Sequence, residues 1–67
     1  MNIPVAPDSD LARNHRKFVA LGLLFRVENV GDGYEHRVRR GSDAGLGAVI
    51  SYDIRGDLLD LGAYDVG

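Results

Sequence analysis

The residues that could carry metal-binding chemistry are few in this chain of 67 residues. There is no cysteine, so neither a disulfide nor a thiolate ligand is available. The two histidines, His15 and His36, each fall on the apolar face of an expected element, where a histidine at the core edge is commoner than a metal ligand. Asp53, Asp57 and Asp60 do not have the spacing of a calcium loop. We therefore expect no metal site and no cofactor.

The sequence gives equally little support for nucleophilic or acid–base catalysis. Asp53 and Asp60 face each other in the expected second hairpin, and such a pair can separate its pKa values, but an exposed hairpin face offers no dry cleft. The serines have no histidine beside them in the sequence, and no nucleophile elbow is present. Arg55-Gly56-Asp57 has the letters of an adhesive tripeptide, but turn chemistry explains it. We expect a protein that is not an enzyme.

The nine glycines invite a search for phosphate-binding loops. Neither a P-loop nor a dinucleotide-binding fingerprint is present. The segment 41–47 could offer backbone N–H groups to an anion, but Asp43 would repel one. We interpret this segment as a connecting loop. A short helical turn capped by Ser42 is the competing interpretation.

The strongest signal is the distribution of charge, which the net charge of −2 conceals. Residues 11–40 contain seven bases and three acids, whereas residues 41–67 contain one base and five acids. Clustered bases are how proteins neutralise phosphates, so a nucleic-acid-binding domain is the alternative hypothesis. Its candidate contact residues are Arg13, Arg16, Lys17, Arg37, Arg39 and Arg40. The acidic net charge and the small number of free aromatic residues count against it.

Apolar residues exceed what one small core requires, and this favours protein binding as the leading hypothesis. Leu58, for example, alternates with Leu59, so the two cannot both point inward from a regular strand. The expected partner is a larger protein or a nucleoprotein complex. Small acidic domains of this kind include inhibitors and adaptors of phages and mobile elements. The candidate partner-binding residues are Arg37, Arg39 and Arg40 as a polar rim, with Tyr34, Leu58 and Tyr64 as anchors.

The length predicts a single small domain over residues 8–67, preceded by an extended tail over residues 1–7 that contains two prolines. The longest nearly apolar run, residues 18–25, is too short to cross a membrane. The first ten residues lack the features of a signal peptide. We therefore expect no membrane association and a cytoplasmic location.

The spacing of apolar residues predicts a helix over about 9–22. Its apolar face consists of Leu11, His15, Phe18 and Val19. Asp8, Ser9 or Asp10 can cap its N-terminus, and Gly22 can cap its C-terminus.

A period of two then predicts strands. In the first hairpin Phe25 pairs with Val38, Val27 with His36 and Asn29 with Tyr34, because this register brings both apolar faces together. A second hairpin joins residues 49–55 to residues 58–64 through a type II′ turn at Gly56-Asp57. Its expected pairs are Arg55–Leu58, Ile54–Leu59, Tyr52–Leu61 and Ile50–Ala63, with Asp53 facing Asp60 on the other side. The expected fold is α+β: an N-terminal helix on a four-stranded antiparallel sheet made of two hairpins.

A chain of this size without disulfide or metal gains stability by associating. We therefore predict a twofold homodimer, joined through the strand over residues 58–64 as an unpaired sheet edge. Asp60 and Asp65 oppose this pairing, because they bring like charges together across the axis.

Overall fold

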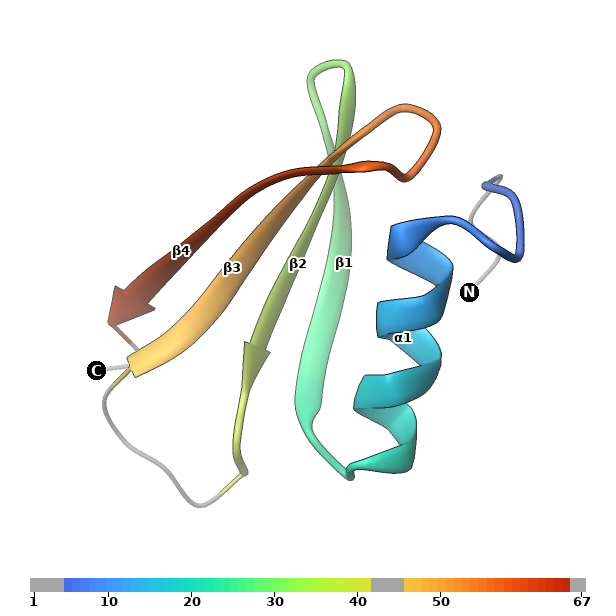
Figure 1. Ribbon diagram of the computed structural model, residues 1–67. Helices are drawn as coiled ribbons and strands as arrows, with labels where there is room; N and C mark the ends of the chain where they lie inside the picture. The colour runs from blue at the N-terminus through green and yellow to red at the C-terminus, as the bar shows by residue number, and fades with distance from the viewer. Residues whose placement is uncertain (1–4, 42–45, 66–67) are drawn as a thin grey trace.

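The computed structural model describes residues 5–41 and 46–65. In this range one helix precedes four strands, which pair in chain order as the antiparallel sheet β1-β2-β3-β4 (Figure 1). The elements are α1 (Asp10–Ala20), β1 (Leu24–Val30), β2 (Gly33–Arg39), β3 (Leu46–Asp53) and β4 (Leu58–Asp65). The α+β fold expected from the sequence is confirmed. The end of the expected loop, at Leu46 and Gly47, belongs to β3, and residues 42–45 lie outside the described residues.

Both ends of α1 are closed by the residues that the sequence suggested. Ser9 is the N-cap, and its hydroxyl accepts a hydrogen bond from the backbone N–H of Ala12 at 3.2 Å. At the other end Gly22 has a φ of 70°, its N–H donates to the carbonyl of Val19, and the N–H of Leu23 donates to that of Phe18. These two bonds form a Schellman motif, in which glycine relieves the strain of a left-handed residue. The helix therefore ends where the chain turns into β1.

The inner face of α1 is narrower than the sequence suggested. Leu11 and Phe18 are buried and His15 is half-buried, as expected for three residues on one helical face. Val19 was predicted on the same face, but it is 60% exposed. It follows Leu11 by eight residues, which turns it about 80° round the helix and away from the sheet. The bases of α1 lie on its exposed side, as predicted.

The first hairpin has the predicted register: Phe25 pairs with Val38, Val27 with His36 and Asn29 with Tyr34. The turn between β1 and β2 contains Gly31, which has a φ of 52°. Side chains alternate between the two faces of the sheet along each strand. We call the face that packs against α1 the helix-side face, and the opposite face the outer face.

The second hairpin differs from the prediction at its turn. The carbonyl of Asp53 accepts a hydrogen bond from the N–H of Gly56, and the N–H of Asp53 donates to the carbonyl of Asp57, both at 2.9 Å. These bonds enclose a three-residue loop, residues 54–56, that ends in Gly56 with a φ of 89°. Loops of this kind combine a type I turn with a left-handed glycine, and they replace the predicted two-residue type II′ turn.

The longer loop changes the register between β3 and β4. Tyr52 pairs with Leu58 and Ile50 with Leu61, so the predicted register is wrong. A β-bulge at Ser51/Tyr52 leaves Leu59 without a partner in the register. The pairs that do not form are Arg55–Leu58, Ile54–Leu59, Tyr52–Leu61 and Ile50–Ala63.

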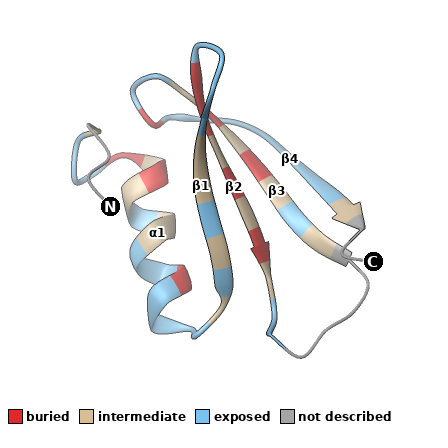
Figure 2. Cartoon of the chain, turned by 180° about the vertical axis from the view of Figure 1, so that it is seen from behind, coloured by how far each residue is buried: buried red, intermediate tan, exposed pale blue. Residues whose placement is uncertain are grey.

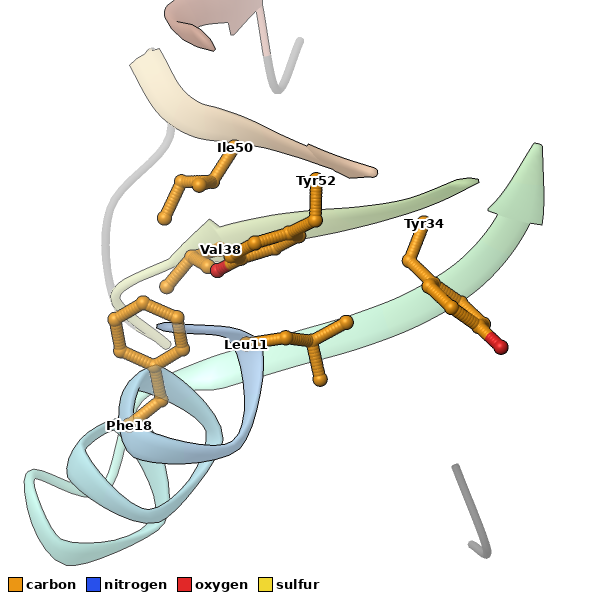
Figure 3. Close-up of a cluster of buried hydrophobic side chains, with 6 residues drawn as sticks. All are labelled: Leu11, Phe18, Tyr34, Val38, Ile50 and Tyr52. Carbon is orange, nitrogen blue, oxygen red and sulfur yellow. The ribbon is translucent and has the colours of Figure 1, made fainter. Parts of the chain in front are cut away.

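The core lies between α1 and the helix-side face of the sheet (Figure 3). Its buried apolar residues are Leu11, Phe18, Tyr34, Val38, Ile50 and Tyr52. Half-buried residues complete the core from its margins, namely Val5, Leu23, Phe25 and Val27. Val5 comes from the segment that we expected to be a tail, so the domain includes that residue.

Candidate protein-interaction surfaces

The residues best suited to catalysis form a network inside the core. The Nδ1 atom of His36 lies 2.7 Å from the Tyr52 hydroxyl, which accepts a hydrogen bond from the Asn14 side-chain amide at 3.0 Å. The Tyr52 hydroxyl therefore links the side chain of Asn14 on α1 to the imidazole of His36 on β2. The rings of Phe18 and Phe25 pack edge-on against the imidazole. Helix and sheet are thus joined by one polar chain that runs through an apolar core.

This network is closed to a substrate. His36 has no exposed surface, and burial followed by the charge of His15 lowers its pKa to about 4. Burial also raises the pKa of the Tyr52 hydroxyl. Both groups are therefore neutral near pH 7, and the arrangement supports packing and not acid–base exchange with a ligand.

The acids of the second hairpin are occupied by backbone donors. The Asp53 carboxylate accepts hydrogen bonds from the N–H groups of Arg55 and Asp57, and the Asp60 carboxylate accepts one from the N–H of Leu61. In the register, Asp60 pairs with Ser51 and not with Asp53. The predicted carboxylate pair is therefore wrong, and Asp53 stabilises the turn in the manner of an Asx turn.

The outer face carries its charges in two parallel rows. Arg26 of β1 pairs with Arg37 of β2, and we call these two residues the arginine row. Two residues further along, Glu28, Glu35 and Asp60 of three different strands lie in one line with Ser51, and we call the three acids the acidic row. Within each strand the rows are joined by salt bridges. Arg26 Nε lies 3.0 Å from Glu28 Oε1, and Arg37 Nε lies 2.8 Å from Glu35 Oε1.

Among the described residues, Tyr64 is the aromatic residue of the outer face. It pairs with Gly47, and a Cβ atom at that glycine would lie 2.6 Å from the tyrosine ring, so the ring covers Gly47. The guanidinium of Arg37 lies over the same ring, 5.2 Å from its centroid. Two predicted partner-binding residues therefore meet on one surface.

The other predicted partner-binding residues are dispersed. Arg39 is on the outer face beside Leu24, and Arg40 is exposed just after β2. Leu58 is 46% exposed at the start of β4, where it pairs with the inward-facing Tyr52. Tyr34 is only 8% exposed and belongs to the core, so it is not a surface anchor. The confirmed register of the first hairpin places it on the same inward face as His36 and Val38, and this buries the ring.

The six bases of the nucleic-acid hypothesis are divided between opposite sides of the domain. Arg37 and Arg39 alternate with the buried Val38 and so lie on the outer face. The helical bases are on the exposed side of α1, beyond the other face of the sheet. Of these, Arg13 pairs with Asp10, and Arg16 donates to the carbonyl of Pro7. No single basic surface joins the two groups within the described residues.

The largest exposed apolar residues of the sheet lie on β4. Leu58, Leu59 and Leu61 are 46%, 66% and 64% exposed, and we call them the β4 apolar strip. Leu58 and Leu61 pair with the inward-facing Tyr52 and Ile50, so these two lie on the helix-side face, beyond the part that α1 covers. Figure 2 shows β4 exposed along most of its length. The expected register paired Leu59 with Ile54 and Leu61 with Tyr52, and nothing in the chain signals how far the helix reaches across the sheet.

The start of β4 is held by the helix. The backbone N–H of Leu58 donates to the Asp10 carboxylate at 2.8 Å. This bond, and after it the contact with Arg13, lowers the pKa of Asp10 below its ordinary value. Together with the Asp60–Leu61 bond, it engages two backbone donors of the edge strand. These carboxylates and the bulge are features that discourage strand addition, and they count against the predicted dimer through this edge.

Comparisons with protein-family models, with curated proteins and with solved structures found no match to this chain. In the described ranges no three histidine or acidic side chains gather as a metal site would require. Within the same ranges, α1 is too short and too polar to cross a membrane. The candidate sites are therefore the two surfaces, the β4 apolar strip and the outer face.

Proposed function

We propose that this domain is a non-enzymatic protein-binding module whose main contact surface is the β4 apolar strip. The observation that carries the proposal is the exposure of Leu59 and Leu61, each about two-thirds exposed although both belong to one strand of the sheet. Apolar residues grouped in this way on a small domain mark a surface that another molecule covers.

The surroundings of the strip indicate the chemistry of its partner. Asp57 and Asp60 are exposed beside the leucines, and the charge of residues 41–67 is acidic as a whole. A partner that presents apolar side chains with lysine or arginine at the margin would match both properties. The domain then acts by occupying that surface, which is how small inhibitors and adaptors work.

Variants on two matched pairs of exposed apolar residues test this proposal. The double variant Leu59→Lys/Leu61→Lys places two charges in the strip, whereas Val19→Lys/Leu21→Lys places them at the end of α1. The control pair is 60% and 65% exposed, close to the 66% and 64% of the strip. Partners are first identified by cross-linking the wild-type chain in the cells that express it, and their affinities are then measured by titration.

We expect the strip variant to lose at least about tenfold in affinity, because apolar anchors at the centre of an interface dominate its binding energy. The helix variant should bind as the wild type does. Equal binding by all three proteins, with unchanged circular dichroism, would contradict the proposal. The nucleic-acid hypothesis is not carried forward, because its basic residues lie on opposite sides of the domain.

A further inference from the structure

The two arginines of the outer face keep hydrogen-bond donors that are not engaged by their own salt bridges. Arg26 and Arg37 each contact their glutamate through Nε. A guanidinium has five N–H donors in a planar fork, so four donors on the terminal nitrogens remain for another acceptor. Among the described residues no hydrogen bond reaches those nitrogens in either arginine. The arginine row can thus accept a second row of carboxylates.

The two rows have the geometry of a surface that complements itself. They run across neighbouring strands and are two residues apart along each strand, which is about 7 Å. A twofold axis parallel to the rows and midway between them exchanges their positions. A second copy turned about this axis brings its acidic row over the arginine row, and its arginine row over the acidic row. The arginines and glutamates of β1 and β2 thus find complementary charges in the second copy, whereas Asp60 of β4 comes over the position of Gly62.

We propose that the outer face of the sheet pairs with the outer face of a second copy of this chain, about a twofold axis between the arginine row and the acidic row. Arg26 then faces Glu28 of the partner, and Arg37 faces Glu35 of the partner. Each occurs twice by symmetry. Every guanidinium lies between two carboxylates, one from its own strand and one from the other copy.

Apolar residues at the ends of β1 fit the same axis. Leu24 and Val30 lie on the outer face, 48% and 41% exposed, at equal distances on either side of the axis. The rotation therefore places Leu24 of one copy over Val30 of the other, at both ends of the interface. Each contact buries apolar surface that the single domain leaves in water.

Sheet geometry permits this contact. The rotation keeps each strand over its own counterpart, and the right-handed twist of both copies is then matched along the interface. Four strands of seven or eight residues offer a face of about 19 Å by 25 Å. This is smaller than the ~800 Å² per partner of a standard interface. We therefore expect a weak dimer, with a dissociation constant in the micromolar range.

This dimer is separate from the proposed binding of a partner protein. Leu58 and Leu61 of the β4 apolar strip lie on the helix-side face of the sheet, outside the outer-face contact. Each dimer would then carry two such strips.

The experiment is sedimentation equilibrium of the full chain over a range of concentrations. The mass should rise from 7.3 kDa towards twice that value as concentration increases. Raising the salt from about 0.05 M to about 0.5 M should weaken the association severalfold, because the charges are screened. A mass of one chain at every concentration would overturn the proposal.

A row exchange makes the test specific. The quadruple variant Arg26→Glu/Glu28→Arg/Glu35→Arg/Arg37→Glu preserves opposite charges within each strand, so it should fold. It should dimerise with itself, because its rows are exchanged in both copies. It should not pair with the wild type, because like charges then face each other. Mixed dimers at the statistical proportion, read from labelled chains by fluorescence transfer, would overturn the proposed axis.

The strip variant Leu59→Lys/Leu61→Lys separates the two proposals. It should dimerise as the wild type does while losing its partner protein. If it becomes monomeric, self-association uses the strip and the outer-face axis is wrong. If it dimerises and still binds the partner, the proposed function is wrong and the axis stands.

Discussion

Strands β2 and β4 differ in burial in a way that their residue types do not explain, since the leucine-rich strand is the exposed one. In β2 the residues Gly33, Tyr34, His36 and Val38 are buried. In β4 every residue from Leu58 to Ala63 is exposed, although three of the six are leucines. The difference follows from position, since β2 is central and packed beneath the helix, whereas β4 is at the edge.

The width of one helix accounts for this contrast. A helix with its side chains is about 10 Å across, and strands are about 4.8 Å apart, so one helix covers two strands and part of a third. The side chains of α1 reach Phe25 on β1, His36 on β2 and Tyr52 on β3. Among the hydrogen bonds of the described residues, the one from Asp10 connects α1 to β4, through the backbone N–H of Leu58. Leucines on the fourth strand stay in water until another molecule covers them.

The largest effect should come from truncating a leucine under the helix. Leu11 is 1% exposed and Leu61 is 64% exposed, so the two leucines represent the covered and uncovered regions. Leu11→Ala should lower the free energy of unfolding by about 2–5 kcal/mol, because it leaves a cavity. Leu61→Ala should change it by less than about 0.5 kcal/mol. Urea unfolding followed by circular dichroism measures both, and similar losses would show that β4 is covered in solution.

The second-largest effect should come from acid, which lowers the free energy of unfolding through a residue in the core beneath the helix. His36 has a pKa of about 4 in the fold and an ordinary value of 6.5. Because the folded pKa is the lower one, the unfolded chain binds the proton first as the pH falls. The contribution of His36 to the free energy of unfolding is therefore full well above pH 6.5 and is lost as the pH falls towards 4, by about 3 kcal/mol in total. Urea midpoints across this range measure the decline.

The control for the acid effect is His36→Phe, which keeps a ring among the aromatic residues of the core. This variant should unfold at a midpoint that varies much less between pH 6.5 and 4. An unchanged slope would assign the decline to another group. The contribution of Asp10 to stability can be told apart from that of His36. Because the pKa of Asp10 is lowered in the fold, its contribution is lost mainly below pH 3.8.

A smaller effect should come from the turn that joins the two regions. Gly56 has a φ of 89°, and a Cβ there would lie 3.0 Å from the Ser9 hydroxyl. Gly22 has a φ of 70° but open space around it. Gly22→Ala should cost about 1 kcal/mol from backbone strain alone, and Gly56→Ala about 2 kcal/mol, since crowding adds to strain. Thermal unfolding of both variants compares them, and equal losses would mean that Ser9 moves aside freely.

The helix and the first hairpin could be predicted because their signals are local. Ser9 and Gly22 mark the two helix ends through cap chemistry. The register of β1 and β2 follows from the match between two apolar faces across a short turn. Each of these features depends on residues within about a dozen positions, which the sequence displays directly.

The second hairpin could not be predicted in the same way. Gly56 suits both a two-residue and a three-residue loop, and the Asp53 side chain selects the latter by accepting two N–H donors. The exposed apolar strip on β4 could not be predicted from the sequence for another reason. Burial of Leu59 and Leu61 depends on the width of a helix about forty residues earlier, and Tyr34 is buried by that same helix.

The bond between Asp10 and the N–H of Leu58 has a consequence for how the chain folds. Strands that pair in sequence order close only short loops, so the sheet can grow hairpin by hairpin at little entropic cost. The Asp10–Leu58 contact spans 48 residues and closes nearly the whole domain. We expect its formation to come late in folding. During synthesis, the Asp10 carboxylate in the first turn of α1 cannot accept this hydrogen bond until Leu58 has left the ribosome.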